Sequence, residues 1–200
     1  MGRKKPEVLK KTKPIFYIFC EGKRTEVNYF ERLLQENGLP TNGVIGYGID
    51  PKRLLEYGID KEKTKENKDQ VWIVFDKDNI EKDSFNKTII NCINEEIGFA
   101  FSNPCFELWL WLHLKDITRN HSTKECTKQF SKDFQSTFGI EYNKTNTICI
   151  QKIDTTEKRE LAITRAKKLD KAFNSSQNFA DHNPNTTVYK LVEKILNNSL

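Results

Sequence analysis

The stretch IFYIFC at residues 15–20 is matched further along the chain by VWIVF at residues 71–75. Both are short apolar runs rich in β-branched and aromatic residues, the pattern of strands buried on both faces of a parallel sheet. Between them, residues 43–49 predict a weaker strand, and residues 50–69 predict a helix followed by an exposed loop. This alternation of strands and helices predicts an α/β fold in which helices flank a mostly parallel sheet.

The neighbouring segments extend the same pattern. Thr25 can cap a helix that ends at the Asn-Gly pair of residues 37–38. After the second apolar run we expect a helix over 84–96 and a strand over 97–102. Pro104 can open a further helix, which is apolar nearly all round. Its aromatic stripe has helical spacing, so we expect that helix to lie in the core.

The chain divides into three parts by composition. Residues 1–13 are expected to be a basic flexible arm, residues 14–120 an α/β core, and residues 121–200 a mostly helical extension packed on the same domain. In the last part, helices are expected near 157–173 and 186–196, with a polar loop over 174–184.

Bulk properties narrow the class of protein. The chain has 200 residues, 30% charged residues, five cysteines and a net charge of +5. The small basic excess slightly favours an anionic partner such as nucleic acid. Because the cysteines form no C-x-x-C pair, a disulfide framework and a zinc knuckle are both disfavoured. No apolar run approaches the roughly 18 residues that a membrane span needs, so we expect a soluble cytoplasmic protein without a membrane partner.

Acidic residues stand at two predicted strand ends. Glu21 directly follows the first run, and Asp76 and Asp78 follow the second. Ligands of parallel sheets bind beyond the carboxyl ends of strands. If the chain stays extended there, Asp76 and Asp78 point the same way and can share one cation that Glu21 also approaches. Carboxylates suit Mg²⁺ or Mn²⁺. The alternative is that these acids are solvated turn residues or helix caps.

Four ordered motifs resemble the RloB-like family. They are CEGKRTEVNYF at 20–30, VFDKD at 74–78, SNPCFELWL at 102–110 and NPNTTV at 183–188. RloB-like proteins in turn resemble Toprim-domain proteins, whose Rossmann-like fold is shared with primases, type II topoisomerases and overcoming-lysogenization-defect nucleases. That resemblance implies that Glu21, Asp76 and Asp78 bind magnesium for phosphodiester chemistry, as the early Glu and the Asp-x-Asp pair do in Toprim domains.

The resemblance also implies a biological setting. Such proteins are expected in bacterial phage defence, as toxic nuclease effectors beside an ABC-type ATPase partner. The AbiL and PARIS systems are similar, and the PARIS effector acts on transfer RNA. The substrate implied here is therefore RNA, such as tRNA, or DNA, and the effector is expected to stay latent until it is activated.

Other residues near the acids are further candidates. Glu107 could assist catalysis by ligating a second metal or orienting water, or could simply complement the helix dipole. Lys23 and Arg24 could neutralise phosphate charge. Glu26 could support the metal ligands from behind or act as a capping residue.

A second group of candidates consists of uncharged polar residues. Ser102, Asn103 and Asn183 could contact phosphate or nucleic acid, and equally could serve as turn and capping residues. The three histidines show no metal spacing and no Ser or Cys partner, so a nucleophilic triad is unsupported. His113 is expected to pack in the core.

Two rival functions remain to be weighed. A phosphohydrolase of the haloacid-dehalogenase type also places Asp-x-Asp after a buried strand, but normally after the first strand of the fold. A non-catalytic Toprim-like subunit that binds or regulates other components of a defence complex is the second rival. Retention of all three acids argues against a dead site, so a metal-dependent nuclease is the favoured function.

Overall fold

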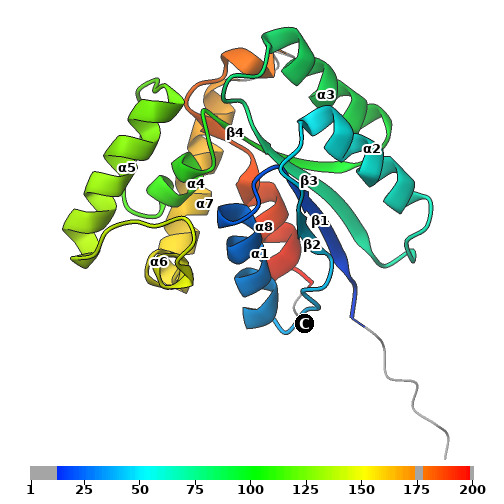
Figure 1. Cartoon of the computed structure of the whole chain (residues 1–200), viewed down its shortest axis with the longest axis horizontal. Coiled ribbons are helices and arrows are strands. Elements are labelled where there is room, and N and C mark those ends of the chain that lie inside the picture. The colour runs from blue at the N-terminus through cyan, green and yellow to red at the C-terminus, as the bar shows by residue number, and fades with distance from the viewer. Residues whose placement is uncertain (1–12, 174–177, 199–200) are drawn as a thin grey trace, which may run out of the picture.

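A single five-stranded sheet with the order β2-β1-β3-β4-β5 forms the centre of the molecule (Figure 1). The computed structural model describes residues 13–173 and 178–198. Neighbouring strands are parallel except for β5, which is antiparallel to β4. The strands are β1 Phe16–Cys20, β2 Val44–Gly46, β3 Gln70–Asp76, β4 Gly98–Asn103 and β5 Asn185–Thr186. The predicted α/β fold with a mostly parallel sheet is confirmed.

Helices cover both faces of the sheet. Figure 1 shows α2 and α3 on one side and α1 and α8 on the other. The helices are α1 Thr25–Glu36, α2 Pro51–Glu62, α3 Lys82–Asn94, α4 Glu107–Leu112, α5 Thr123–Phe138, α6 Thr147–Ile153, α7 Thr156–Ala172, the 3-10 turn η1 Phe179–Asp181 and α8 Val188–Leu196. A helical C-terminal part is therefore confirmed as well.

The strands β1 and β3 are largely apolar on both faces because each face of the sheet has its own layer of helices. Ile18 of β1 packs with α1, α4 and α8, while its neighbour Phe19 packs with α2 and α3. Successive side chains of a strand point to opposite faces, so a strand covered on both sides shows an unbroken apolar run. Burying each such side chain contributes roughly 1.5–3 kcal/mol.

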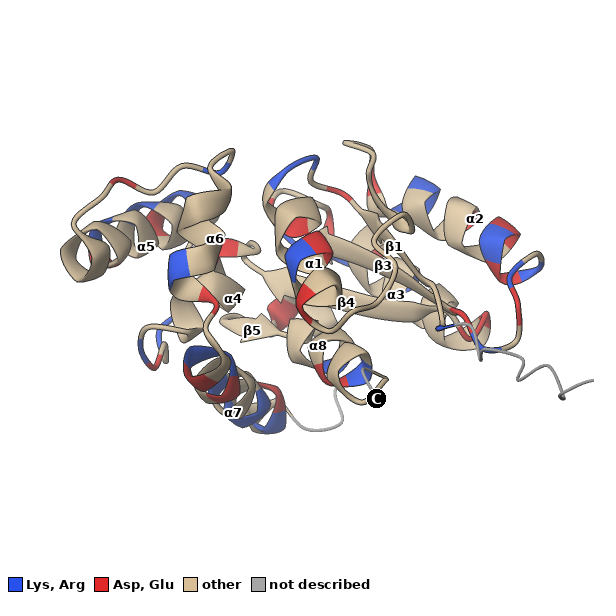
Figure 2. Ribbon diagram, turned by 90° about the horizontal axis from the view of Figure 1, so that it is seen from below, with Lys and Arg blue, Asp and Glu red and all other residues tan. Residues whose placement is uncertain are grey.

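Helix α4 is the centre of the larger core. All six of its residues, Glu107 included, are buried. Helix α5 packs Cys126, Phe130 and Phe134 into the same core, and in Figure 1 it stands apart from the sheet. The predicted central helix is thus confirmed. Helix α7 instead lies at the surface, and Figure 2 shows both acidic and basic segments along it.

The register of the central strands places their carboxyl ends together. Cys20 of β1 pairs with Val74 of β3, and Asp76 of β3 pairs with Ser102 of β4. The amide of Glu21 donates to the carbonyl of Val74 at 2.8 Å. The acids that follow β1 and end β3 therefore leave the sheet at the same edge.

Three local predictions were wrong. Thr25 is the first residue of α1 and not its cap. Helix α4 begins at Glu107 and not at Pro104, because the Pro104 carbonyl accepts the amide of Asp78 in the strand-end loop. Thr186, the expected start of the last helix, instead lies in β5, where it pairs with Ser102 of β4. In the second and third cases a distant part of the chain supplies the partner that overrides the local pattern.

Some predictions concern the ends and the loops of the chain. Apart from Lys13, the expected basic arm over 1–13 lies outside the described residues, as do residues 174–177 of the expected polar loop. The boundary near residue 120 stays a prediction. All five cysteines are free and buried. Within the described parts of the chain, none of the helices is both long and apolar enough to cross a membrane.

Candidate functional site

A cavity of about 660 Å³ lies at the carboxyl ends of β1 and β3. We call it the acid cavity, because its lining includes Glu21, Glu26, Asp50, Asp76 and Asp78. The amide of Asp76 donates to Oε2 of Glu21 at 3.1 Å, which joins the two strand ends directly. The structure thus brings together all three acids that the sequence predicts as metal ligands.

Burial and mutual repulsion act on these carboxyl groups. Burial raises the pKa of Glu26 to about 7, and the negative charges of Glu107 and Glu21 add to that rise. Burial and then the charge of Glu26 raise the pKa of Asp76 well above its usual range. The pKa of Glu21 is also raised by burial, although the amide of Asp76 opposes the rise. The site therefore favours a positive charge among its oxygens.

Asp78 departs from the extended geometry that the sequence suggested. Strand β3 ends at Asp76, and Asp78 has a φ of +29°, which is uncommon for a residue other than glycine. Its carboxylate accepts a hydrogen bond from Thr123 Oγ1 at 2.7 Å. The expectation that Asp76 and Asp78 follow one extended strand is therefore wrong, although both still line the acid cavity.

Glu26 is closer to the centre of the site than the sequence suggested. It is buried and lies against the loop that follows β1: a Cβ atom on Gly22 would lie 2.1 Å from Glu26 Oε2. Only glycine leaves room for this carboxylate. The N-cap of α1 is Arg24, whose side chain forms no capping hydrogen bond, whereas the Glu26 carboxylate accepts a hydrogen bond from its own backbone amide in the first turn. Glu26 lines the cavity itself.

Glu107 is buried next to the cavity and holds a lysine at its edge. Its Oε1 accepts from Lys144 Nζ at 2.7 Å and from the Tyr142 hydroxyl at 3.4 Å. Lys144 lines the cavity. The sequence analysis missed Lys144 and Tyr142, because nothing in their local pattern distinguishes them from other residues of a polar loop. Lys23 and Arg24 are exposed and line the cavity, where the sequence placed them.

The three uncharged polar candidates form hydrogen bonds within the fold. The Ser102 hydroxyl lies 3.0 Å from that of Thr186 in the interior, and Asn103 donates to the Ala180 carbonyl at 3.0 Å. Asn183 holds the backbone of His121, accepting from its amide at 3.2 Å and donating to its carbonyl at 2.8 Å. Ser102 is only 1% exposed, so a phosphate does not reach it. None of the three lines the acid cavity, but Asn103 and Asn183 line a second cavity on the other side of Asp78.

The donor chemistry of the acid cavity fits a hard divalent cation. Carboxylate oxygens are the ligands that Mg²⁺ and Mn²⁺ prefer. Among residues 13–173 and 178–198, no group of three or more His, Cys, Asp or Glu side chains is placed so that it could hold a metal ion by itself. Mg²⁺ commonly binds through one or two carboxylates together with waters and substrate phosphates, so a complete protein cage is not required. The raised pKa values of Glu26 and Asp76 give the cavity an electrostatic reason to take up a cation.

Comparison with known proteins agrees with the motifs. The family model described as RloB-like protein matches residues 16–195, which includes every element of the sheet and the whole acid cavity. No curated protein and no solved structure gives a significant match. The chain therefore belongs to the RloB-like protein family.

Proposed function

We propose that this RloB-like protein is a metal-dependent nuclease that hydrolyses phosphodiester bonds of nucleic acid. The observation that supports this function is the acid cavity, where Glu21, Asp76 and Asp78 converge at the carboxyl ends of parallel strands. Buried carboxylates that repel one another are stabilised by a bound cation. A phosphate can then complete the coordination of that cation.

In this proposal Glu21, Asp76 and Asp78 hold Mg²⁺ or Mn²⁺, and Glu26 offers a further carboxylate. When bound, the ion polarises the phosphate and stabilises charge on the leaving oxygen. Lys144, which Glu107 holds at the cavity, supplies a fixed positive charge for a phosphate oxygen. Glu107 thus acts through Lys144, and exposed Lys23 and Arg24 add charge at the mouth of the cavity.

The setting we propose follows from the family. We propose that the protein acts in the bacterial cytoplasm as a Toprim-like effector of phage defence, under the control of an ABC-type ATPase partner. Membership of the RloB-like family supports this setting. Control by a partner would keep a toxic nuclease latent until phage infection.

The first test is a cleavage assay with purified protein. Total tRNA and plasmid DNA are incubated separately with Mg²⁺, Mn²⁺ or EDTA, with the Asp76→Asn variant in parallel. We expect cleavage of one substrate that requires metal and is lost in the variant. The substrate that is cut then identifies RNA or DNA as the target.

Two other outcomes would change the proposal. Cleavage that persists in EDTA, or in Asp76→Asn, would overturn the assignment of the acid cavity. Absence of cleavage with every metal, and also after addition of the proposed ABC-type ATPase partner, would favour a non-catalytic subunit that binds or regulates other components.

A further inference from the structure

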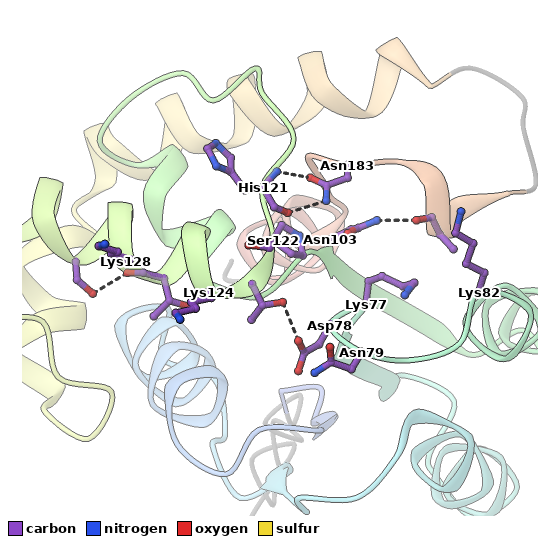
Figure 3. Close-up of a pocket in the computed structure, with 15 residues that line it drawn as sticks. Lys77, Asp78, Asn79, Lys82, Asn103, His121, Ser122, Lys124, Lys128 and Asn183 are labelled. Carbon is purple, nitrogen blue, oxygen red and sulfur yellow. Dashed lines mark hydrogen bonds between the residues drawn. The ribbon is translucent and has the colours of Figure 1, made fainter.

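A second and larger cavity lies on the other side of Asp78. Its volume is about 860 Å³, and it runs between α5 and the carboxyl ends of β3 and β4. We call it the lysine cleft. Figure 3 shows Lys124 and Lys128 on the α5 side and Lys77 and Lys82 on the side of the sheet. Among the residues that the structure describes, Asp78 is the only acidic one in its lining.

The lysines of α5 form a regular stripe along one wall. Lys124 and Lys128 are one helical turn apart, and Thr127 and Ser131 complete the face that lines the cleft. Both lysines are exposed, and neither forms an ion pair with any carboxylate that the structure describes. A helix face with this spacing is usually apolar when its role is packing. Here the opposite face of α5 supplies the core residues, so the stripe is left for solvent or a ligand.

The lysines of the facing wall are partly occupied. Lys82 is paired with Asp181 at 2.5 Å, and the ammonium of Lys77 donates to the carbonyl of Ile80. Lys77 therefore lies in the lysine cleft, and it is absent from the lining of the acid cavity. Lys124 and Lys128 are therefore the two lysines of the cleft whose ammonium groups are most available to a ligand.

The α5 wall is held firmly in place. Ser122 and Glu125 form a reciprocal capping box at its start. Just before it, both hydrogen bonds of the Asn183 side chain to His121 fix the backbone. On the far side, Phe130 and Phe134 are fully buried. A wall that is ordered before binding loses little entropy when an anion binds.

Asp78 connects the lysine cleft to the acid cavity. It belongs to the lining of both, and its carboxylate accepts a hydrogen bond from Thr123, the first residue of α5. A polyanion that lies along Lys124 and Lys128 therefore continues past Asp78 to the carboxylates of the acid cavity. Along the helix the two lysines are roughly 6 Å apart, close to the rise of two nucleotides on one duplex strand.

We propose that the lysine cleft binds the sugar–phosphate backbone of the nucleic acid strand next to the phosphodiester bond that is cut. Lys124 and Lys128 contact the phosphates, and Asp78 marks the point where the strand enters the acid cavity. This inference rests on the proposed nuclease function, which it extends by assigning the path of the substrate. Phosphate contacts of this kind are independent of base sequence.

The test measures binding separately from cleavage. Fluorescence anisotropy is recorded with labelled single-stranded RNA, single-stranded DNA and duplex DNA of one mixed sequence, over a range of salt concentrations. EDTA prevents metal-dependent cleavage, and a parallel series uses Asp76→Asn with Mg²⁺. The double variant Lys124→Gln/Lys128→Gln is compared with wild type. The matched control is Lys168→Gln/Lys171→Gln, which removes the same charge from exposed positions on α7.

We expect the α5 variant to bind the preferred probe about tenfold more weakly near 0.1 M salt. The slope of log K against log salt should fall by about 0.7–0.9 for each lysine removed, whereas the α7 control should match wild type. The probe that binds most tightly identifies single-stranded RNA, single-stranded DNA or duplex as the occupant of the cleft.

The failures of the two proposals can be told apart. If the α5 variant and the α7 control have equal affinity and equal slopes, the cleft proposal is overturned even where metal-dependent cleavage is seen. If no probe binds in either series, it is overturned too. If binding depends on Lys124 and Lys128 but no metal supports cleavage, with or without the ATPase partner, the cleft is still a site for the sugar–phosphate backbone and the nuclease proposal fails.

Discussion

The protein buries carboxyl groups in two places, and their surroundings shift the pKa values in opposite directions. In the acid cavity, Glu26 and Asp76 have raised pKa values because burial and neighbouring acids disfavour their charge. Between α6 and α7, Asp154 is also buried, yet Arg159 donates to both of its oxygens, at 2.8 and 2.7 Å. Burial alone would raise the pKa of Asp154, but hydrogen bonds from His113 and Arg159 lower it to about 2.

The contrast separates structural from functional charge. The Asp154 network consists of Asp154, Arg159, His113, Tyr29 and Glu36. The two ring nitrogens of His113 lie 3.0 Å from the Trp109 carbonyl and 3.1 Å from Asp154 Oδ1. Every charge in this network has a partner. The acid cavity has more buried negative charge than Lys144 balances, an arrangement that costs stability and is typical of a binding site.

Removing the charge of Asp76 should have the largest effect, and it should fall on activity. With Mg²⁺ and the preferred substrate, we expect Asp76→Asn to cut at least about a thousandfold more slowly, equivalent to about 4 kcal/mol of transition-state stabilisation. Its melting temperature should match or exceed that of wild type in EDTA, because a buried repulsion is removed. Activity above a tenth of the wild-type rate would contradict the metal-ligand role.

Removing Asp154 should act on stability instead. Asp154→Ala leaves the Arg159 guanidinium buried without its main partner, so we expect a loss of about 3–5 kcal/mol in the free energy of unfolding. Urea denaturation at pH 7 measures it. Asp60→Ala, which removes the exposed ion pair with Lys63, is the control and should change stability little.

The pH dependence of the Asp154 effect follows from its lowered pKa. The folded-state value of about 2 lies below the ordinary 3.8, so the stabilisation is present above about pH 4 and is lost as the pH falls toward 2. The difference between wild type and Asp154→Ala should therefore shrink between pH 4 and pH 2. If the difference in stability stays constant over this range, Asp154 stabilises the fold through packing rather than through its charge.

Neutralising Glu26 should stabilise the metal-free protein. Its folded pKa of about 7 exceeds the ordinary 4.5, so stability is lost as the pH rises from 4.5 through 7. We expect Glu26→Gln to increase the free energy of unfolding, measured by urea denaturation in EDTA, by about 1–3 kcal/mol at pH 8. At pH 4 the increase should be small, because both side chains are neutral there. A destabilised variant at pH 8 would contradict the idea that this carboxylate is under-compensated.

Added Mg²⁺ should produce the smallest of these effects. At about ten times its dissociation constant, a bound ion stabilises the fold by about 1.4 kcal/mol, which corresponds to a rise of about 3–5 °C in melting temperature for a chain of this size. We expect this rise at pH 8 in wild type and in Asp154→Asn, but not in Asp76→Asn. An equal rise in all three proteins would place the ion elsewhere.

Local pattern was sufficient for the four parallel strands and for the acids that follow β1 and β3. The apolar runs of β1 and β3 were recognisable because strands buried on both faces lack polar positions, and Glu21 and Asp76 could be placed at the strand ends from their position alone. The buried helix α4 was recognisable for the same reason. Predictions were wrong where a residue far away in the chain supplied the hydrogen-bond partner. The Pro104 carbonyl accepts from the Asp78 amide, and the Thr186 hydroxyl contacts that of Ser102.

The α/β class, the family and the set of acids at the strand ends could be predicted without the structure, because they depend on periodicity and on motifs that are local in the chain. The tertiary structure alone decided that Lys144 reaches Glu107, that Thr123 holds Asp78, and that α5 turns a stripe of lysines toward the strand ends. The reason is physical: periodicity says which face of an element is buried, whereas the partner across a cavity depends on how elements far apart in the chain pack together.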